Sequence, residues 1–184
     1  MGDCSEVAGF YSGKSVLITG STGFLGKVLV EKLLRTLPEV KHIYLLIRPQ
    51  SGLDAQQRLE GLLKSNLFDK VRTEHPERLQ KLIAVRGNIM EQDLALSQPD
   101  AHRLCDQVAI VFHCAATIKF DEVMRISVEM NVVGTQRLLA LCHKMRNLVA
   151  FVHTSTAYAN CDRKHIIESV YPPPIQPQKL IDAL

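Results

Sequence analysis

The chain has 184 residues, which is about the length of one domain and enough to bury a hydrophobic core. Hydrophobic residues make up 46% of the chain and charged residues 22%, as is typical of a soluble globular protein. The net charge of +3 is small and dispersed, so we expect no nucleic-acid partner. The sequence has no apolar run long enough to span a membrane, and it does not open on the apolar segment of a signal peptide.

The cysteines and histidines show no spacing that is typical of a metal site, and we predict none. The five cysteines form no C-x-x-C pair; they are Cys4, Cys105, Cys114, Cys142 and Cys161. Their odd number, and the apolar segments around most of them, predict reduced thiols in a reducing compartment.

The first predicted elements are a strand, a glycine-rich turn and a helix. An apolar strand is predicted over residues 15–19. The helix that follows has apolar residues at helical spacing, namely Leu25, Val28, Leu29, Leu33 and Leu37. Between them lies Thr19-Gly20-Ser21-Thr22-Gly23-Phe24-Leu25-Gly26.

The glycines of this turn have the spacing G-x-x-G-x-x-G, a variant of the G-x-G-x-x-G fingerprint of dinucleotide-binding sites, and the alternative is a tight turn in an α/β protein. Gly20 permits a tight turn, Gly23 lets a pyrophosphate approach the backbone, and Gly26 lets the helix pack against the sheet. The N–H groups and the positive dipole end of the helix then face an anion. We interpret the whole turn as cofactor-binding, through Gly20, Ser21, Thr22, Gly23, Phe24, Leu25 and Gly26.

Strands and helices alternate along the rest of the chain. Further strands are predicted over residues 42–47, 82–85, 108–113 and 149–153. Asp54, as N-cap with Gln57 at N3, opens a helix whose apolar face is Ala55, Leu59, Leu62 and Leu63. A long helical stretch covers about residues 121–145, and the proline-rich tail over residues 171–184 predicts an extended surface segment.

This alternation predicts an α/β fold with a Rossmann-like, doubly wound parallel sheet. Residues 1–184 are interpreted as one NAD(P)-binding domain that is incomplete, because the sheet stops after about five strands. A sheet cut short in this way has an exposed edge, which predicts weak stability and self-association through that edge.

Polar residues follow the second and third predicted strands, where such folds bind the adenosine half of the cofactor. Arg48 takes the position where an acid selects NAD and an arginine accommodates the 2′-phosphate of NADP, so NADPH is the predicted cofactor. The alternative is a solvated loop arginine. Asn88 and Ile89 are predicted to lie against the adenine, and the alternative for Asn88 is a turn residue.

Three further segments have the residues for the nicotinamide end and for catalysis. Cys114, Ala115 and Ala116 are small enough to let the backbone approach the nicotinamide ribose, or they pack in the core. Asn131 lies in a helical pattern, where it either braces an active site or satisfies a neighbouring carbonyl. The hydroxyls of Ser155 and Thr156 could polarise a substrate carbonyl, or they could serve as caps and turn formers.

These segments together resemble the extended short-chain dehydrogenase/reductases. The resemblance is closer to the alcohol-forming fatty acyl-CoA reductases of animals, and it covers nearly the whole chain as the N-terminal portion of such an enzyme. The segments that show it are Gly23-Phe24-Leu25-Gly26-Lys27-Val28-Leu29, Phe112-His113-Cys114-Ala115-Ala116-Thr117, Ser155-Thr156-Ala157-Tyr158, Arg163-Lys164-His165-Ile166 and Tyr171-Pro172-Pro173-Pro174.

The resemblance implies NADPH-dependent reduction of long-chain fatty acyl-CoA to a primary fatty alcohol through two hydride transfers. It implies that Thr156 orients the substrate carbonyl, with Ser155 as the second candidate and Asn131 at the active site. It also implies a membrane-associated peroxisomal location, although the chain itself has the composition of a soluble protein. At Asn88 the family usually has Asp, which affects the expected contact with adenine.

One expected catalytic element is missing from the sequence. In the family a Tyr-x-x-x-Lys pair supplies the proton, but none of the four tyrosines here has a lysine four positions later. The chain alone is therefore expected to be inactive. Two other interpretations stay open: a catalytically inactive dinucleotide-binding or interaction protein, and another extended family member such as a sugar-nucleotide epimerase.

Overall fold

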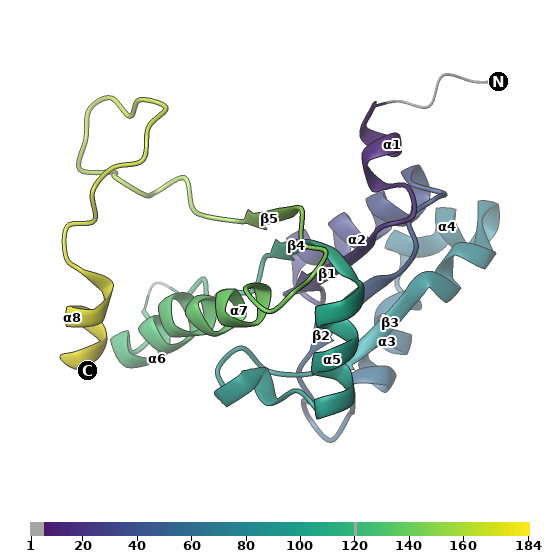
Figure 1. The fold of residues 1–184 in the computed structure, drawn as a ribbon, viewed down its shortest axis with the longest axis horizontal. Helices are drawn as coiled ribbons and strands as arrows, with labels where there is room; N and C mark the ends of the chain where they lie inside the picture. The colour runs from purple at the N-terminus through teal and green to yellow at the C-terminus, as the bar shows by residue number, and fades with distance from the viewer. Residues whose placement is uncertain (1–5, 120) are drawn as a thin grey trace.

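The structure is a computed structural model that describes residues 6–119 and 121–184. Five parallel strands form one sheet in the order β3-β2-β1-β4-β5 (Figure 1). Their bounds are β1 Ser15–Thr19, β2 Ile43–Ile47, β3 Leu82–Arg86, β4 Val108–His113 and β5 Ala150–His153. The five predicted strands and the predicted Rossmann-like parallel sheet are confirmed.

The strand order creates a crevice next to β1. β2 pairs with one side of β1, while β4, which comes much later in the chain, pairs with the other. At the carboxyl end of β1, Thr19 is in register with Leu46 of β2 and His113 of β4. The connections leave this point in opposite directions, and open α/β sheets bind their ligands in such a crevice.

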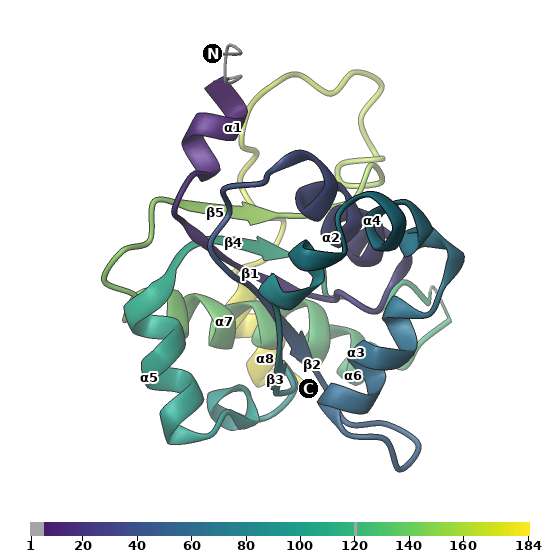
Figure 2. The same cartoon turned by 90° about the vertical axis from the view of Figure 1, so that its right-hand side faces the viewer.

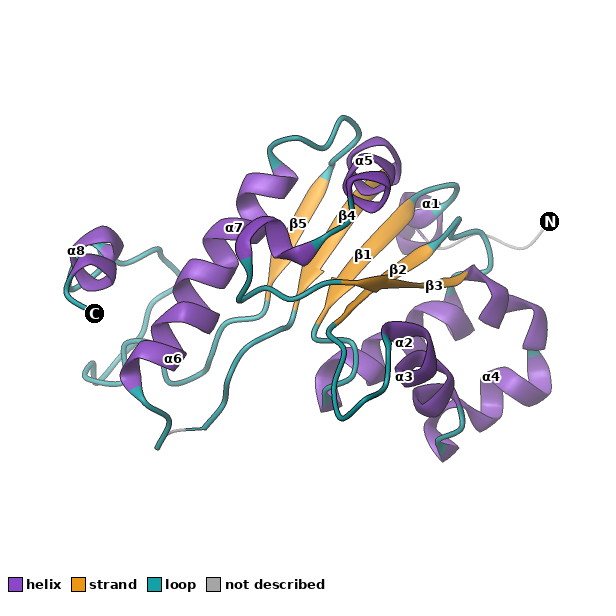
Figure 3. Ribbon diagram, turned by 90° about the horizontal axis from the view of Figure 1, so that it is seen from below, coloured by secondary structure: helices purple, strands orange, loops and turns teal. Residues whose placement is uncertain are grey.

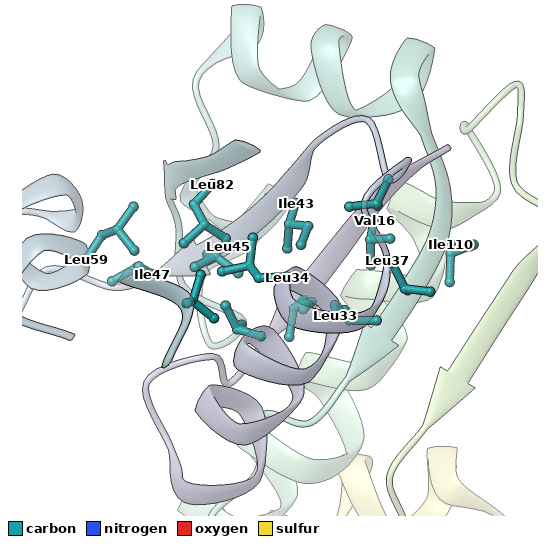
Figure 4. Close-up of a cluster of buried hydrophobic side chains, with 14 of the residues drawn as sticks. Val16, Leu33, Leu34, Leu37, Ile43, Leu45, Ile47, Leu59, Leu82 and Ile110 are labelled. Carbon is teal, nitrogen blue, oxygen red and sulfur yellow. The ribbon is translucent and has the colours of Figure 1, made fainter. Parts of the chain in front are cut away.

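Helices cover both faces of the sheet, as Figures 2 and 3 show. On one face lie α2 Phe24–Thr36, α3 Ala55–Leu63 and α4 Asp69–Glu74, and on the other α5 Gln98–Gln107 and α7 Gly134–Cys142. Alternate strand residues enter two separate cores: Val16 and Ile18 pack in the first, shown in Figure 4, and Leu17 in the second. This period of two is what a sheet buried on both faces requires.

The buried face of α2 agrees with the predicted one only in its second half. Leu33 and Leu37 are buried as predicted, with Leu34 beside them, but Leu25 is 48% exposed and Val28 is 37% exposed. The first turn of α2 lies over the glycine-rich turn rather than over the strands, so its apolar side chains have no sheet beneath them. In contrast, the predicted start of α3 is confirmed, because Asp54 and Gln57 form a reciprocal capping box.

The predicted stretch over 121–145 is shorter and less regular than expected. It consists of α6 Met124–Val128, a π-helical turn η4 Glu129–Val133, and α7. A π-helical turn inserts extra backbone into a helix and is common at functional sites.

Four helices were not predicted: α1 Glu6–Tyr11, α4, α5 and α8 Pro177–Asp182. α5 has few apolar residues to give a helical period, and α8 is a correction to the extended tail. A proline lies in the first turn of α5 and of α8, where its missing N–H costs no hydrogen bond. Residues 171–176 before α8 contain no helix or strand, as predicted.

The predictions about cysteines, membrane-spanning segments and the sheet edge are compared with the structure in turn. The four cysteines in the described chain are free, whereas Cys4 lies outside the described residues. Within the described ranges, every helix is too short or too polar to cross a membrane. β5 forms one edge of the sheet, and Val152 on it is exposed, but association through this edge stays a prediction.

The two faces of α2 give a matched stability test. Leu34→Ala should lower the free energy of unfolding by about 2–5 kcal/mol, because it opens a cavity against β2. Leu25→Ala should change it by about 0.5 kcal/mol or less, because that side chain is half exposed. Urea unfolding of both variants measures this difference, and equal losses would contradict the observed orientation of α2.

Candidate functional site

The turn after β1 touches the chain that follows β4. Gly20 has a φ of +70°, and a Cβ added there would lie 2.7 Å from the backbone N of Ala115 and from the carbonyl C of Cys114. Only glycine avoids both the backbone strain and the collision. The turn is therefore pressed against the carboxyl end of β4, directly at the crevice between the two strands.

Gly26 permits a close approach of the helix to the backbone at the carboxyl end of β1. A Cβ on Gly26 would lie 2.2 Å from the carbonyl oxygen of Gly20 and 2.7 Å from the Cα of Ser21. The contact is with the first residues after the strand, so the predicted packing of the helix is concentrated at the turn. α2 thus begins directly over the turn, with Gly23 as an N-cap that has no side-chain hydrogen bond.

This geometry leaves an anion-binding helix start. The N–H groups of Phe24, Leu25 and Gly26, in the first turn of α2, have no carbonyl four residues earlier within the helix. The side chains of Phe24 and Leu25 are exposed, so these two residues can serve a ligand through their backbone N–H groups. Ser21 is buried, and its hydroxyl oxygen has no hydrogen-bond partner within the described residues. Both features fit the pyrophosphate of a dinucleotide.

A cavity of about 220 Å³ opens at the carboxyl ends of β1, β2, β3 and β4. It brings together most of the predicted cofactor residues, namely Gly20, Thr22, Gly23, Arg48, Asn88, Ile89, Cys114, Ala115 and Ala116. Ser21, Phe24, Leu25 and Gly26 do not line it. Lining residues that were not predicted are Thr19, Leu46, Ile47, Arg58, Gly87 and Met130.

Two arginines line this cavity, Arg48 and Arg58. The guanidinium of Arg58, on α3, donates hydrogen bonds to the carbonyl oxygen of Arg48 and to the hydroxyl of Thr22. Burial, and then the positive charge of Arg48, lower the pKa of Arg58. Arg48 itself is exposed and is held through its backbone carbonyl, so its contact with a 2′-phosphate stays a prediction. The sequence analysis missed Arg58 because only the folded position of α3 brings it to the cavity. A second positively charged residue ten positions after Arg48 was the signal that could have indicated it.

Asn88 is a turn residue that also lines the cavity. Its side-chain oxygen accepts a hydrogen bond from the N–H of Met90, and its own N–H donates to the carbonyl of Leu94 at 2.7 Å. Contact between Asn88 and an adenine stays a prediction. Cys114 and Ala115 are partly buried and Ala116 is exposed, so all three are positioned to face a ligand, while Ala115 also packs against the second core.

A second cavity, of about 630 Å³, shares Ala115 and Ala116 with the first. It brings together the three predicted catalytic residues, Asn131, Ser155 and Thr156. The hydroxyl of Thr156 accepts the N–H of Tyr158 at 3.2 Å, so its proton is free to point elsewhere. Asn131 lies in η4, and its side chain accepts the N–H of Thr117 at 2.9 Å and donates to the carbonyl of Thr117 at 3.2 Å. Asn131 therefore clamps the wall of this cavity.

His113 is a buried residue between the two cavities that sequence reasoning did not single out. Its Nδ1 lies 2.7 Å from the hydroxyl of Thr19, and its Nε2 lies 2.9 Å from the hydroxyl of Thr135. Burial, and then the nearby His153, lower the pKa of His113 to about 4. No group of three or more potential metal ligands gathers anywhere in the described ranges.

The fold and the first cavity define a class of protein. A five-stranded parallel sheet in this order, with a glycine turn at the crevice and a helix start free for a pyrophosphate, is typical of nicotinamide-dinucleotide-binding domains. An NAD-binding family described as "Male sterility protein" matches residues 18–183. The chain belongs to this family.

Known proteins extend this result. Human fatty acyl-CoA reductase 1 is 50% identical over 175 residues, covering 95% of this chain and 34% of that protein. Human fatty acyl-CoA reductase 2 is 49% identical over 180 residues, covering 98% of this chain and 35% of that protein. The resemblance to animal fatty acyl-CoA reductases is confirmed, and the chain spans about a third of the length of these relatives.

Solved structures of reductase domains have the same fold. The reductase domain of a non-ribosomal peptide synthetase from Mycobacterium tuberculosis matches with a TM-score of 0.63 and 30% identity, over 84% of this chain and 37% of that chain. The terminal R domain of the myxalamid biosynthetic pathway matches with a TM-score of 0.62 and 27% identity, over 79% of this chain and 35% of that chain.

Two glycines on neighbouring helices give a matched binding test. Gly26→Ala should weaken binding of NADPH by about tenfold or more, because its Cβ would force the start of α2 away from Gly20. Gly61→Ala, on α3, meets nothing within 4 Å and should leave binding unchanged while stabilising the helix by about 0.5–1 kcal/mol. Calorimetric titration and urea unfolding measure the two effects. Unimpaired binding by a folded Gly26→Ala variant would contradict the cofactor role of the turn.

The lowered pKa of His113 predicts a loss of stability in mild acid. Between the ordinary pKa of 6.5 and about 4, the unfolded chain binds a proton that the folded chain does not, so stability falls as the pH falls through this range. A single such group contributes about 1.4 kcal/mol for each pH unit. Urea unfolding from pH 7 to pH 4.5 measures the slope, and His113→Gln should reduce it. His42→Gln is the comparison variant, and it should also reduce the slope, because burial lowers the pKa of His42 as well. An unchanged slope in His113→Gln would refute the assignment.

Proposed function

We propose that this chain binds NADPH and belongs to an enzyme that reduces long-chain fatty acyl-CoA to a primary fatty alcohol. The observation that supports NADPH is the pair of Arg48 and Arg58 at the cavity beside the glycine turn. Two guanidinium groups next to the ribose position suit the 2′-phosphate of NADPH, which NADH lacks. The names of the relatives support the acyl-CoA substrate.

The two cavities divide the proposed reaction. The first takes the adenosine and pyrophosphate, and the second takes the acyl thioester, with Ala115 and Ala116 at the boundary. When bound, NADPH supplies hydride. Ala115 and Ala116 have no side chain long enough to separate the nicotinamide from a substrate carbonyl in the second cavity.

The side chains of the second cavity have distinct proposed roles. The hydroxyl of Thr156 donates a hydrogen bond to the carbonyl oxygen of the thioester and stabilises the negative charge that develops there, with Ser155 as the second candidate. Asn131 holds the backbone of Thr117 and so shapes the wall. Hydride addition gives an oxyanion, which takes up a proton from water to form a hemithioacetal. The hemithioacetal then releases coenzyme A as the thiol and leaves an aldehyde for a second reduction. The peroxisomal location and the place in lipid biosynthesis that the resemblance implies remain predictions.

A second candidate function is dinucleotide binding without turnover. It is favoured by the absence of a Tyr-x-x-x-Lys pair from this sequence, because the group that supplies the proton is often worth about 10²–10⁴-fold in rate. One assay bears on both functions. Oxidation of NADPH by this chain in the presence of palmitoyl-CoA, lost in Thr156→Val, would support the reductase and contradict the expected inactivity of the chain alone. Tight NADPH binding without oxidation would agree with that expected inactivity and leave cofactor binding as the function of these 184 residues.

The arginine pair predicts a preference between the two reduced cofactors. Arg48→Ala and Arg58→Gln should each weaken NADPH binding by about tenfold or more and leave NADH binding nearly unchanged, because in this proposal each removes a charge that pairs with the 2′-phosphate, which NADH lacks. Arg146→Gln, an exposed arginine paired with Asp106, is the control and should change neither. Calorimetric titration of each variant with both cofactors provides the measurement. An equal loss of affinity for NADPH and NADH would mean that the arginines only support the loop.

A further inference from the structure

A line of hydrogen bonds crosses the interior from the glycine turn to the π-helical turn. The N–H of Ala115 donates to the hydroxyl of Thr19 at 3.2 Å, and that hydroxyl lies 2.7 Å from Nδ1 of His113. On the other side of the ring, Nε2 lies 2.9 Å from the hydroxyl of Thr135, which lies 2.8 Å from the carbonyl oxygen of Asn131. His113 is 0% exposed, so water does not replace these partners.

The protons in this line can be assigned by counting donors. The carbonyl oxygen of Asn131 has no proton, so the single hydroxyl proton of Thr135 must lie between them. The oxygen of Thr135 can then only accept from His113, which places a proton on Nε2. In the neutral ring Nδ1 is bare, and it accepts the hydroxyl proton of Thr19, whose oxygen accepts the N–H of Ala115.

The two ends of this line hold the walls of both cavities. At one end, Ala115 lines both cavities and touches the turn at Gly20. At the other end, the backbone of Asn131 is held by Thr135, while its side chain clamps Thr117. The ring of His113 is thus the link between a wall that faces the proposed cofactor and a wall that faces the proposed substrate.

We propose that His113 is a positioning residue, neutral and protonated on Nε2, that holds the Ala115 wall of the first cavity in register with the Asn131 clamp of the second. One test of this proposal, NADPH affinity, rests on the proposed function. The other tests, the protonation of the ring and the hydrogen exchange of the Thr117 amide, do not. It assigns this histidine no contact with cofactor or substrate.

A second proton would break the line. The groups that face the ring are Thr19 from β1, Thr135 from α7, and Phe151 and His153 from β5, with ring centroids 6.3 Å and 5.2 Å away. Among these, the only ionisable side chain is that of His153, and a positive charge on it opposes protonation of His113. A proton on Nδ1 would give the oxygen of Thr19 two incoming donors and leave its own proton without an acceptor. The neutral ring is the form that the site accommodates.

The first experiment reads the ring directly in the 184-residue chain. Nitrogen NMR of the ¹⁵N-labelled protein should show His113 with a protonated, slowly exchanging Nε2 and a bare Nδ1 from pH 7 down to about pH 5. A proton on Nδ1, or a ring that takes up its second proton near its ordinary pKa, would overturn the proposal. This readout needs no cofactor, so it stands even if the chain binds no NADPH.

The second experiment cuts one link and then restores it. Thr135→Val should make the amide hydrogen of Thr117 exchange about tenfold faster and should weaken NADPH binding severalfold. Thr135→Ser, which keeps the hydroxyl, should restore both the exchange rate and the affinity. Thr73→Val removes the same kind of bond, to the carbonyl of Asp69 at 2.8 Å, and is the matched control.

The outcomes separate this proposal from the proposed function. An unchanged Thr117 amide in folded Thr135→Val, or equal effects of Thr135→Val and Thr135→Ser, would overturn the role of His113. If the unmodified chain fails to bind NADPH while Thr117 exchange responds as expected, the linkage stands and the proposed cofactor is wrong.

Discussion

The contact between the backbone of Gly20 and the chain after β4 is the constraint on which the site depends. β1 and β4 are neighbours in the sheet but far apart in sequence, and only a residue without a Cβ lets their carboxyl ends meet with a left-handed turn between them. Gly26 then sets the start of α2 directly over that turn. The free N–H groups of the helix, the cavity and the buried bond from Ala115 to Thr19 all follow from this one close approach.

The first cavity is lined by two positively charged arginines, whereas the histidine buried between the two cavities is neutral. Beside the glycine turn, Arg48 and Arg58 line the first cavity, and in the proposed function the added phosphate of NADPH would neutralise them. Between the two cavities, His113 is kept neutral by burial and by donors and acceptors that match one tautomer. In the proposed function, a neutral ring at this position avoids a second positive charge near the oxidised nicotinamide, while the two arginines attract the anionic end of the cofactor.

Most of the fold could be predicted from local sequence patterns. Most of the cavity-lining residues could be predicted because they follow directly after the predicted strands. The apolar strands and the Asp54 cap are local signals, so the sequence was sufficient for them. The buried face of α2 was misjudged because Leu25 has helical spacing but no sheet beneath it. His113 and Arg58 could not be placed, because their roles depend on partners that are distant in the chain: Thr19 is 94 residues from His113, and Thr22 is 36 residues from Arg58.

The small residues after β4 connect these observations. The sequence left two interpretations of Ala115 and Ala116 open: packing in the core, and close approach to a ligand. In the structure, Ala115 has the contacts of both. Ala115 contacts the second core, donates its N–H into the buried line and lines both cavities. A larger side chain at either alanine would extend toward the space where the two cavities share their lining. In the proposed function, small side chains there let cofactor and substrate approach each other, and the hydrogen bonds of Thr19 and His113 hold the backbone of Ala115.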